Sequence, residues 1–193
     1  MKSKELSLKE LEKECEEWAE IISKDYIPDF IIYIAKAGYP IAYYMNSVFQ
    51  VTLVGVEAVR EGNEIKAKLG KIFSYLPNII RNVLIYIELN SSIHKIKSER
   101  KVRWLSDISM YHPKQILLVD DSVDTGYSIV SVKKIIKDLF PDCEIRTAGL
   151  NVWDKSKNVV NIDYSLYNNI IIKAPMSKDS KYYDEFIDMY VNK

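Results

Sequence analysis

The sequence is poor in the residues and patterns from which metal clusters, nucleotide loops and membrane spans are built. Its two cysteines, Cys15 and Cys143, lie far apart and in no metal-ligand spacing, and His94 and His112 have no partner at metal or triad spacing. The six glycines form neither a Gly-rich lysine loop nor a dinucleotide-binding fingerprint. No apolar run approaches the ~20 residues that span a bilayer. The charged start of the chain does not resemble a secretory segment. We therefore expect a protein without a membrane span, located in the cytoplasm.

The chain also has no excess charge of either sign. Basic and acidic residues number 27 each, so no overall field attracts nucleic acid or an anionic membrane, and we expect no nucleic-acid partner. Of the 193 residues, 48% are hydrophobic and 28% are charged. This composition is typical of one globular domain with a sizeable core.

Apolar strand patterns alternate with helical patterns along much of the chain. Apolar residues recur at three- and four-residue steps between Leu8 and Ile22 and again between Ile129 and Leu139, as on one face of a helix. Alternating strands and helices predict a Rossmann-like α/β fold, with a mostly parallel, twisted sheet flanked by helices. The predicted strands are Phe30 to Ala35, Val51 to Val56, Ile116 to Val119, Ile145 to Leu150 and Ile170 to Ile172, and a further helix is predicted from Ile41 to Val48.

Two segments fit this pattern less well. Residues 61–105 predict an inserted helical arm, with helices at 65–76 and 78–89 divided by Pro77, followed by a basic loop from Lys95 to Arg103. Residues 156–193 predict a small C-terminal flap over the sheet. We expect both segments to be additions to a single domain that covers residues 1–193.

The richest chemical pattern follows the predicted strand Ile116 to Val119. This strand delivers Asp120 and Asp121 to its carboxyl end, the edge of an open α/β sheet where ligands bind. Ionised carboxylates are pure hydrogen-bond acceptors, so adjacent ones suit the two hydroxyls of a sugar diol. They can also hold Mg²⁺, directly or through its waters.

The next residues form a turn that enters a helix. Gly126 permits a close backbone approach, while Thr125 and Ser128 add hydroxyl donors. The first N–H groups of a helix are unsatisfied and favour an anion, so a phosphate is the natural occupant of residues 124–128. A diol site beside a phosphate site describes a ribose 5-phosphate.

The segment from Ile116 to Ser128 resembles the signature of type I phosphoribosyltransferases that binds phosphoribosyl pyrophosphate (PRPP): four hydrophobic residues, two acids, two variable positions, Asp-Thr-Gly, one variable position and a hydroxyl residue. The resemblance implies an Mg²⁺-dependent transferase that releases pyrophosphate, and homodimers are common in the family. It implies that Asp120 and Asp121 bind the ribose hydroxyls and the metal, and that Asp124 acts as the base. The implied PRPP-binding residues are Asp120, Asp121, Asp124, Thr125, Gly126, Tyr127 and Ser128.

A second resemblance concerns the loop after the first predicted sheet strand. In the family this loop binds pyrophosphate, often through a strained or cis peptide, and Lys36, Ala37 and Gly38 occupy that position here. Lys36 would neutralise the leaving group as a catalytic residue. The usual Arg-Gly-Gly form is Lys-Ala-Gly in this chain.

The acceptor of the phosphoribosyl group stays open between two kinds of molecule. The segment from Leu150 to Lys155 resembles the strand end where 6-oxopurine enzymes contact their base, which would make Trp153 and Lys155 acceptor-binding residues, and Asp163-Tyr164 resembles their downstream Asp-Tyr pair. A glycan hydroxyl in polysaccharide assembly is the other acceptor, because Asp124 could take its proton. A regulatory protein of the same fold that only senses PRPP or a nucleotide is the alternative to an enzyme.

Overall fold

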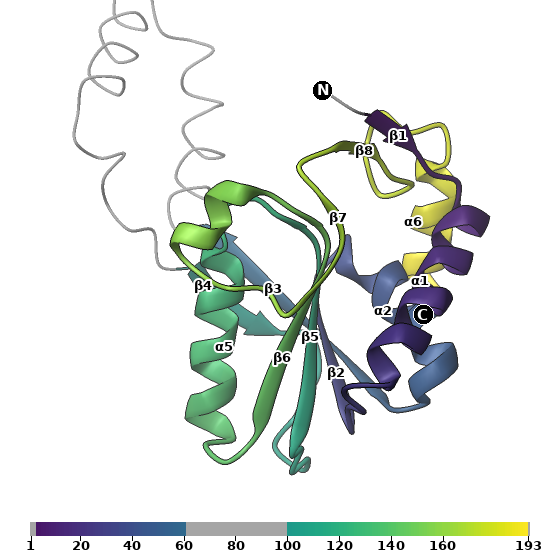
Figure 1. Cartoon of the computed structure of the whole chain (residues 1–193). Coiled ribbons are helices and arrows are strands. Elements are labelled where there is room, and N and C mark those ends of the chain that lie inside the picture. The colour runs from purple at the N-terminus through teal and green to yellow at the C-terminus, as the bar shows by residue number, and fades with distance from the viewer. Residues whose placement is uncertain (1–2, 61–99, 193) are drawn as a thin grey trace, which may run out of the picture. The chain divides into compact units, whose positions relative to one another are not determined.

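The computed structural model describes residues 3–60 and 100–192 (Figure 1). The chain divides into two compact units, one of residues 1–58 and 102–193 and one of residues 59–101. The helices predicted at 65–76 and 78–89 lie outside the described residues. The candidate site described below belongs to the first unit.

The described residues contain a six-stranded sheet in the order β4-β3-β2-β5-β6-β7. Strand β2 pairs in parallel with β3 and β5, β5 with β6, and β6 with β7. This topology confirms the predicted α/β fold with a mostly parallel sheet. The strands are β2 (Phe30–Ile34), β3 (Thr52–Arg60), β4 (Arg100–Trp104), β5 (Gln115–Val123), β6 (Glu144–Val152) and β7 (Tyr164–Asn168).

The central strands form because each is a short, nearly continuous apolar run. All five residues of β2 and residues 116–120 of β5 are buried. Such runs suit strands that are covered on both faces, as parallel strands are. The register sets Phe30 beside Ile116 and Tyr33 beside Val119, so both strands reach the same edge of the sheet with their carboxyl ends.

Helices cover the sheet on both faces (Figure 1). Helices α1 (Leu8–Ser23), α2 (Gly38–Phe49) and α6 (Tyr183–Val191) contribute to a core that contains Leu11, Met45, Phe186 and Leu117. Helix α5 (Tyr127–Leu139) contributes to the core on the other face, as the predicted apolar stripe required. A capping box begins α1, because Ser7 and Glu10 bond reciprocally.

The structure corrects the end of the predicted arm. Residues Arg100–Trp104 form strand β4 rather than part of a basic loop, with the backbone N–H of Leu105 donating to the carbonyl of Gly55 at 2.9 Å. Its burial alternates, and Val102 and Trp104 pack against the core on the α5 face, so the basic residues of this segment belong to a half-buried strand. The second predicted strand also extends further, to Arg60.

The residues predicted as a flap take several forms. A 3₁₀ helix, η2 (Asp154–Asn158), precedes β7, which lies in the main sheet. The apolar strand predicted at Ile170 to Ile172 is β8 (Ile171–Lys173), which pairs in parallel with β1 (Ser3–Glu5) in a separate two-stranded sheet. No apolar pattern marked β1. Within residues 3–60 and 100–192, no helix is long and apolar enough to cross a membrane.

Candidate active site

Strand β5 continues past the apolar run and carries both motif acids within its carboxyl end. Asp120 is 6% exposed and stands beside Gly149 of β6 in the register. The backbone N–H of Asp121 donates to Asp120 Oδ1 at 3.0 Å. Burial raises the pKa of Asp121, and hydrogen bonds from Asp120 and Ser122 only partly oppose this change. The motif acids therefore lie at the sheet edge, Asp120 buried and Asp121 half-buried.

The turn after β5 has the backbone form that its glycine allows. Gly126 has φ of 82° and directly precedes α5, which begins at Tyr127. A Cβ at Gly126 would lie 2.4 Å from Val160 Cγ1, so the position has no room for a side chain. Thr125, Tyr127 and Ser128 are half-buried around this helix N-terminus, which is the geometry of an anion site.

The predicted pyrophosphate loop lies against the end of β5. The peptide bond between Ala35 and Lys36 is cis, at the position where the family resemblance led us to look for one. Gly38 packs closely here, because a Cβ on it would lie 3.1 Å from the carbonyl oxygen of Val119 and 3.8 Å from Cα of Asp120. The fold thus brings together two loops that are about eighty residues apart in the sequence.

Lys36 is an exposed residue of this loop. Its Nζ lies 5.7 Å from the ring centroid of Tyr190 in α6, within the range of a cation–π contact. This contact leaves the donors of the ammonium group available to an anion. Ala37 follows directly and precedes the first residue of α2.

The two residues predicted to bind the acceptor are placed differently. Lys155 pairs with Asp124, with 2.6 Å between Nζ and Oδ1, and both side chains are more than half exposed. Trp153 instead precedes η2, and its backbone N–H donates to the carbonyl of Val123 at 3.0 Å. Lys155 therefore contacts Asp124, the predicted general base, while Trp153 lies next to the motif strand.

A cavity of about 180 Å³ lies between the end of the motif strand and the C-terminal segment. Its lining combines polar groups from β5, β6 and the C-terminal segment with apolar residues around β8. Trp153 belongs to this lining and Lys155 does not. The lining residues are Asp121, Ser122, Leu150, Asn151, Trp153, Ile170, Ile171, Ile172, Ala174 and Ser177.

Asn151 is the cavity residue that the sequence predictions missed. It is 5% exposed, and its Nδ2 donates to the carbonyl of Ile170 at 2.8 Å. Its Oδ1 is buried and has no hydrogen-bond partner among the described residues. The available signal was an asparagine inside an otherwise apolar strand end, where a polar side chain requires a partner.

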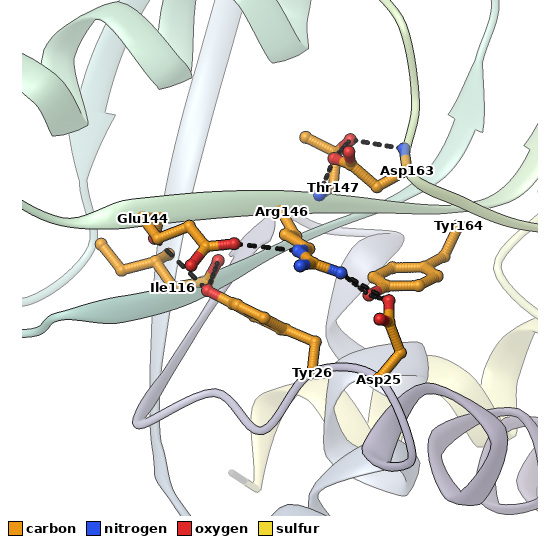
Figure 2. A network of polar contacts seen from close by, with 8 residues as sticks. All are labelled: Asp25, Tyr26, Ile116, Glu144, Arg146, Thr147, Asp163 and Tyr164. Atoms are coloured by element: carbon orange, nitrogen blue, oxygen red, sulfur yellow. Dashed lines mark hydrogen bonds and ion pairs between the residues drawn. The ribbon is translucent and has the colours of Figure 1, made fainter.

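The predicted Asp163-Tyr164 pair lies in a polar network near the start of β6 and β7 (Figure 2). Asp163 Oδ2 accepts from both the backbone N–H and the hydroxyl of Thr147, at 2.8 and 2.7 Å. The hydroxyl of Tyr164 donates to Asp25 at 2.6 Å and accepts from Arg146 at 2.7 Å. Neither Asp163 nor Tyr164 lines the cavity.

The carboxylate oxygens of Asp120 and Asp121 are of the kind that Mg²⁺ binds. In the described part of the chain, no group of three or more metal-ligating side chains comes together. Mg²⁺, however, is usually held by one or two carboxylates together with substrate phosphates and waters, and Asp120 and Asp121 supply two adjacent carboxylates. The residues therefore fit a magnesium ion that arrives with a phosphorylated substrate.

An open parallel sheet with acids, a glycine turn and a helix N-terminus at its carboxyl edge defines the class of α/β proteins that bind phosphorylated ligands there. Residues 6–179 match the family model described as "Phosphoribosyl transferase domain". The chain belongs to this family. No curated protein matches it.

Solved structures with the same fold include two named purine enzymes. One is a xanthine-guanine-hypoxanthine phosphoribosyltransferase of Helicobacter pylori (17% identity, 95% of this chain and 99% of that one, TM-score 0.65). Another is a purine phosphoribosyltransferase of Pyrococcus horikoshii (18% identity, 93% and 97%, TM-score 0.61). A hypothetical protein of Neisseria gonorrhoeae, solved with bound ppGpp, is also similar (16% identity, 99% and 97%, TM-score 0.58). At these identities the likeness concerns the fold.

Proposed function

We propose that this protein transfers the 5-phosphoribosyl group of PRPP to a small acceptor and releases pyrophosphate. The observation that carries the proposal is the meeting of Asp120, Asp121 and the Gly126 turn with the Gly38 loop at one sheet edge. These groups offer separate sites for a diol, a 5-phosphate and a pyrophosphate. The adjacent cavity supplies the place for an acceptor.

The proposed reaction is a displacement at C1 of the ribose. The bond between C1 and the pyrophosphate oxygen breaks as the acceptor forms its bond to C1, and Asp124 takes the acceptor's proton. Lys36 is placed to balance the charge that gathers on the leaving pyrophosphate, while the Asp120–Asp121 pair orients the ring. Mg²⁺, held by this pair and the substrate, would supply further positive charge at the pyrophosphate.

The ion pair between Lys155 and Asp124 gives Lys155 a role other than a direct acceptor contact. At 2.6 Å from Oδ1, its ammonium group restrains the carboxylate of Asp124, the proposed general base. We therefore assign Lys155 as a positioning residue for Asp124.

The acceptor that best suits the cavity is a nucleobase. A volume of about 180 Å³ is smaller than the ~300 Å³ from which pockets for drug-sized ligands begin. A flat heterocycle matches this space and the Trp153 ring better than an oligosaccharide does. A glycan hydroxyl that approaches from outside remains the second acceptor to test, since Asp124 is exposed.

An acceptor screen tests the proposal directly. The protein would be mixed with Mg²⁺ and PRPP and with purine bases, pyrimidine bases or glycans, and pyrophosphate release and product mass would be measured. We expect release that depends on a base. Tight binding of PRPP or ppGpp without release for any acceptor would instead identify a sensor, in keeping with the ppGpp-bound structure of similar fold.

A further inference from the structure

Asn151 is placed at the junction of the three elements that surround the cavity. In the register it lies beside Ser122 of the motif strand on one side and beside Tyr167 of β7 on the other. Its side chain reaches the carbonyl of Ile170, just before β8. Ser122, Asn151 and Ile170 all line the cavity.

The orientation of the Asn151 amide follows from this bond. A carbonyl oxygen can only accept, so the group that faces Ile170 must be the NH₂ and the other must be the oxygen. Oδ1 has no partner among the described residues, although it is buried. A buried acceptor loses its hydrogen bonds to water, and without a protein donor nothing offsets that free-energy cost. Such groups are therefore rare in folded proteins.

The carbonyl that holds the amide is itself held in place. Asn169 has a positive φ of 55°, and its Nδ2 donates to Asp154 Oδ2 at 2.7 Å while its Oδ1 accepts from the Asp154 backbone at 2.9 Å. The backbone N–H of Asn169 also donates to the carbonyl of Val152. These bonds tie the residue before Ile170 to the end of β6, so Asn151 cannot easily turn its oxygen toward another protein donor.

We infer that Asn151 is a specificity-determining residue that selects acceptors carrying an N–H donor at the edge that meets this side chain. The inference rests on the proposed function, because it takes the cavity as the acceptor site. A nucleobase with a suitably placed ring or exocyclic N–H satisfies Oδ1, while an analogue without that hydrogen leaves it unpaired. Sites built around a buried polar group discriminate strongly against ligands that lack its partner.

Matched pairs of ligands test this inference. Isothermal titration calorimetry would compare hypoxanthine, guanine, adenine, uracil and cytosine with their singly N-methylated derivatives. We expect one methylated position to weaken binding to the wild-type protein roughly tenfold or more, as the loss of a hydrogen bond to a buried group does. In Asn151→Leu, the ratio of the dissociation constants for the methylated and unmethylated base should fall to nearly one. The methyl group has the same bulk in both proteins, so a ratio that persists in Asn151→Leu would reveal plain steric exclusion and overturn the inference.

Two further variants keep the test decisive. Asn151→Ala removes the same oxygen through a smaller side chain and should likewise lose the discrimination, which covers the case in which Asn151→Leu fails to fold. Asn161→Leu makes the same change at an exposed asparagine outside the cavity and should match the wild type. Discrimination lost equally in Asn161→Leu, or kept in Asn151→Ala, would contradict a role for the Asn151 oxygen.

The failure of this inference differs from failure of the proposed function. Base binding with Asn151-dependent discrimination, but without pyrophosphate release from PRPP, would refute the transferase and leave the inference standing. Pyrophosphate release from PRPP, with the effect of methylation on binding unchanged in Asn151→Leu, would support the transferase and refute the inference. If no base binds and only a glycan is turned over, the inference is overturned.

Discussion

The two ends of the parallel sheet use polar residues in opposite ways. Near the amino ends of the strands, Arg146 bonds to Glu144, Asp25 and Tyr164 at once, and Tyr26 donates to backbone carbonyls (Figure 2). At the carboxyl ends, the Asn151 oxygen has no partner in the part of the chain that the structure describes, and burial raises the pKa of Asp121. A satisfied network stabilises the fold, while buried groups without a partner are typical of sites that bind a ligand.

The largest expected effect is a loss of turnover at the carboxyl end. Asp124→Asn or Asp121→Asn should lower kcat by roughly 10²–10³, the usual cost of removing one fixed electrostatic contact. Because burial raises the pKa of Asp121, its charge is costly in the folded protein, and Asp121→Asn should not lower the melting temperature at neutral pH.

Steady-state kinetics and thermal unfolding of the same samples would check both parts. Asp142→Asn, an exposed carboxylate in the loop before β6, is the matched control and should behave as the wild type. Wild-type turnover in Asp124→Asn would remove that residue from the proposed site.

Gly126→Ala should affect both activity and stability. The left-handed backbone at φ 82° costs about 1–2 kcal/mol for a residue with a Cβ, and the new methyl group would also meet Val160. We expect a lower free energy of unfolding in urea and a raised KM for PRPP, because the phosphate loop must shift. Val130→Ala, a change at a partly exposed position in the first turn of α5, should leave KM unchanged.

At the amino end, Thr147→Val should lower stability alone. Thr147 is fully buried, and its hydroxyl donates to Asp163 and accepts from the Asp163 backbone N–H. Loss of these bonds should cost about 1 kcal/mol in urea unfolding. Both kcat and KM should be unchanged. A fall in either constant with stability preserved would contradict a purely structural role for this end of the sheet.

The smallest effect concerns the pH dependence of stability. Bonds from Tyr164 and then the charge of Arg146 lower the pKa of Asp25 below its usual value. The resulting stabilisation is present above the pKa of the unfolded chain and disappears as the pH falls through the lower folded-state pKa.

Asp25→Asn should therefore melt below the wild type at neutral pH. The difference should shrink from roughly pH 4 downward, where the carboxyl of the unfolded chain is protonated. Melting temperatures recorded between pH 7 and pH 2 would show this convergence, and a difference that stays constant across the range would rule out the carboxylate as its source.

Much of this contrast could be predicted from the sequence because the decisive signals are local. The apolar run before Asp120 and the Asp-Thr-Gly turn specify a strand, a bend and a helix over consecutive residues, and all three are present. Strand β4 was missed because its basic residues hid the alternation of Val102 and Trp104. Its true neighbours lie on β3, about forty-five residues earlier in the chain.

The side chains around the acceptor cavity were harder to predict for the same physical reason. Trp153 and Lys155 are two residues apart, yet one lines the cavity and the other pairs with Asp124. The Asp163-Tyr164 pair resembles one found in 6-oxopurine enzymes, but the hydroxyl of Tyr164 bonds to Asp25, about 140 residues away in the sequence. Short-range pattern carries no information about such partners.

Local order along the chain thus determined the parallel sheet, the positions of its helices and the loop that suits a phosphorylated sugar. These features depend on hydrophobic periodicity and on the backbone freedom of one glycine, which act within a few residues. Only the tertiary structure decided that Gly38 packs against Val119, that Lys155 pairs with Asp124 and that the oxygen of Asn151 lacks a donor among residues 3–60 and 100–192. Each of these depends on which distant segments the folded sheet sets side by side.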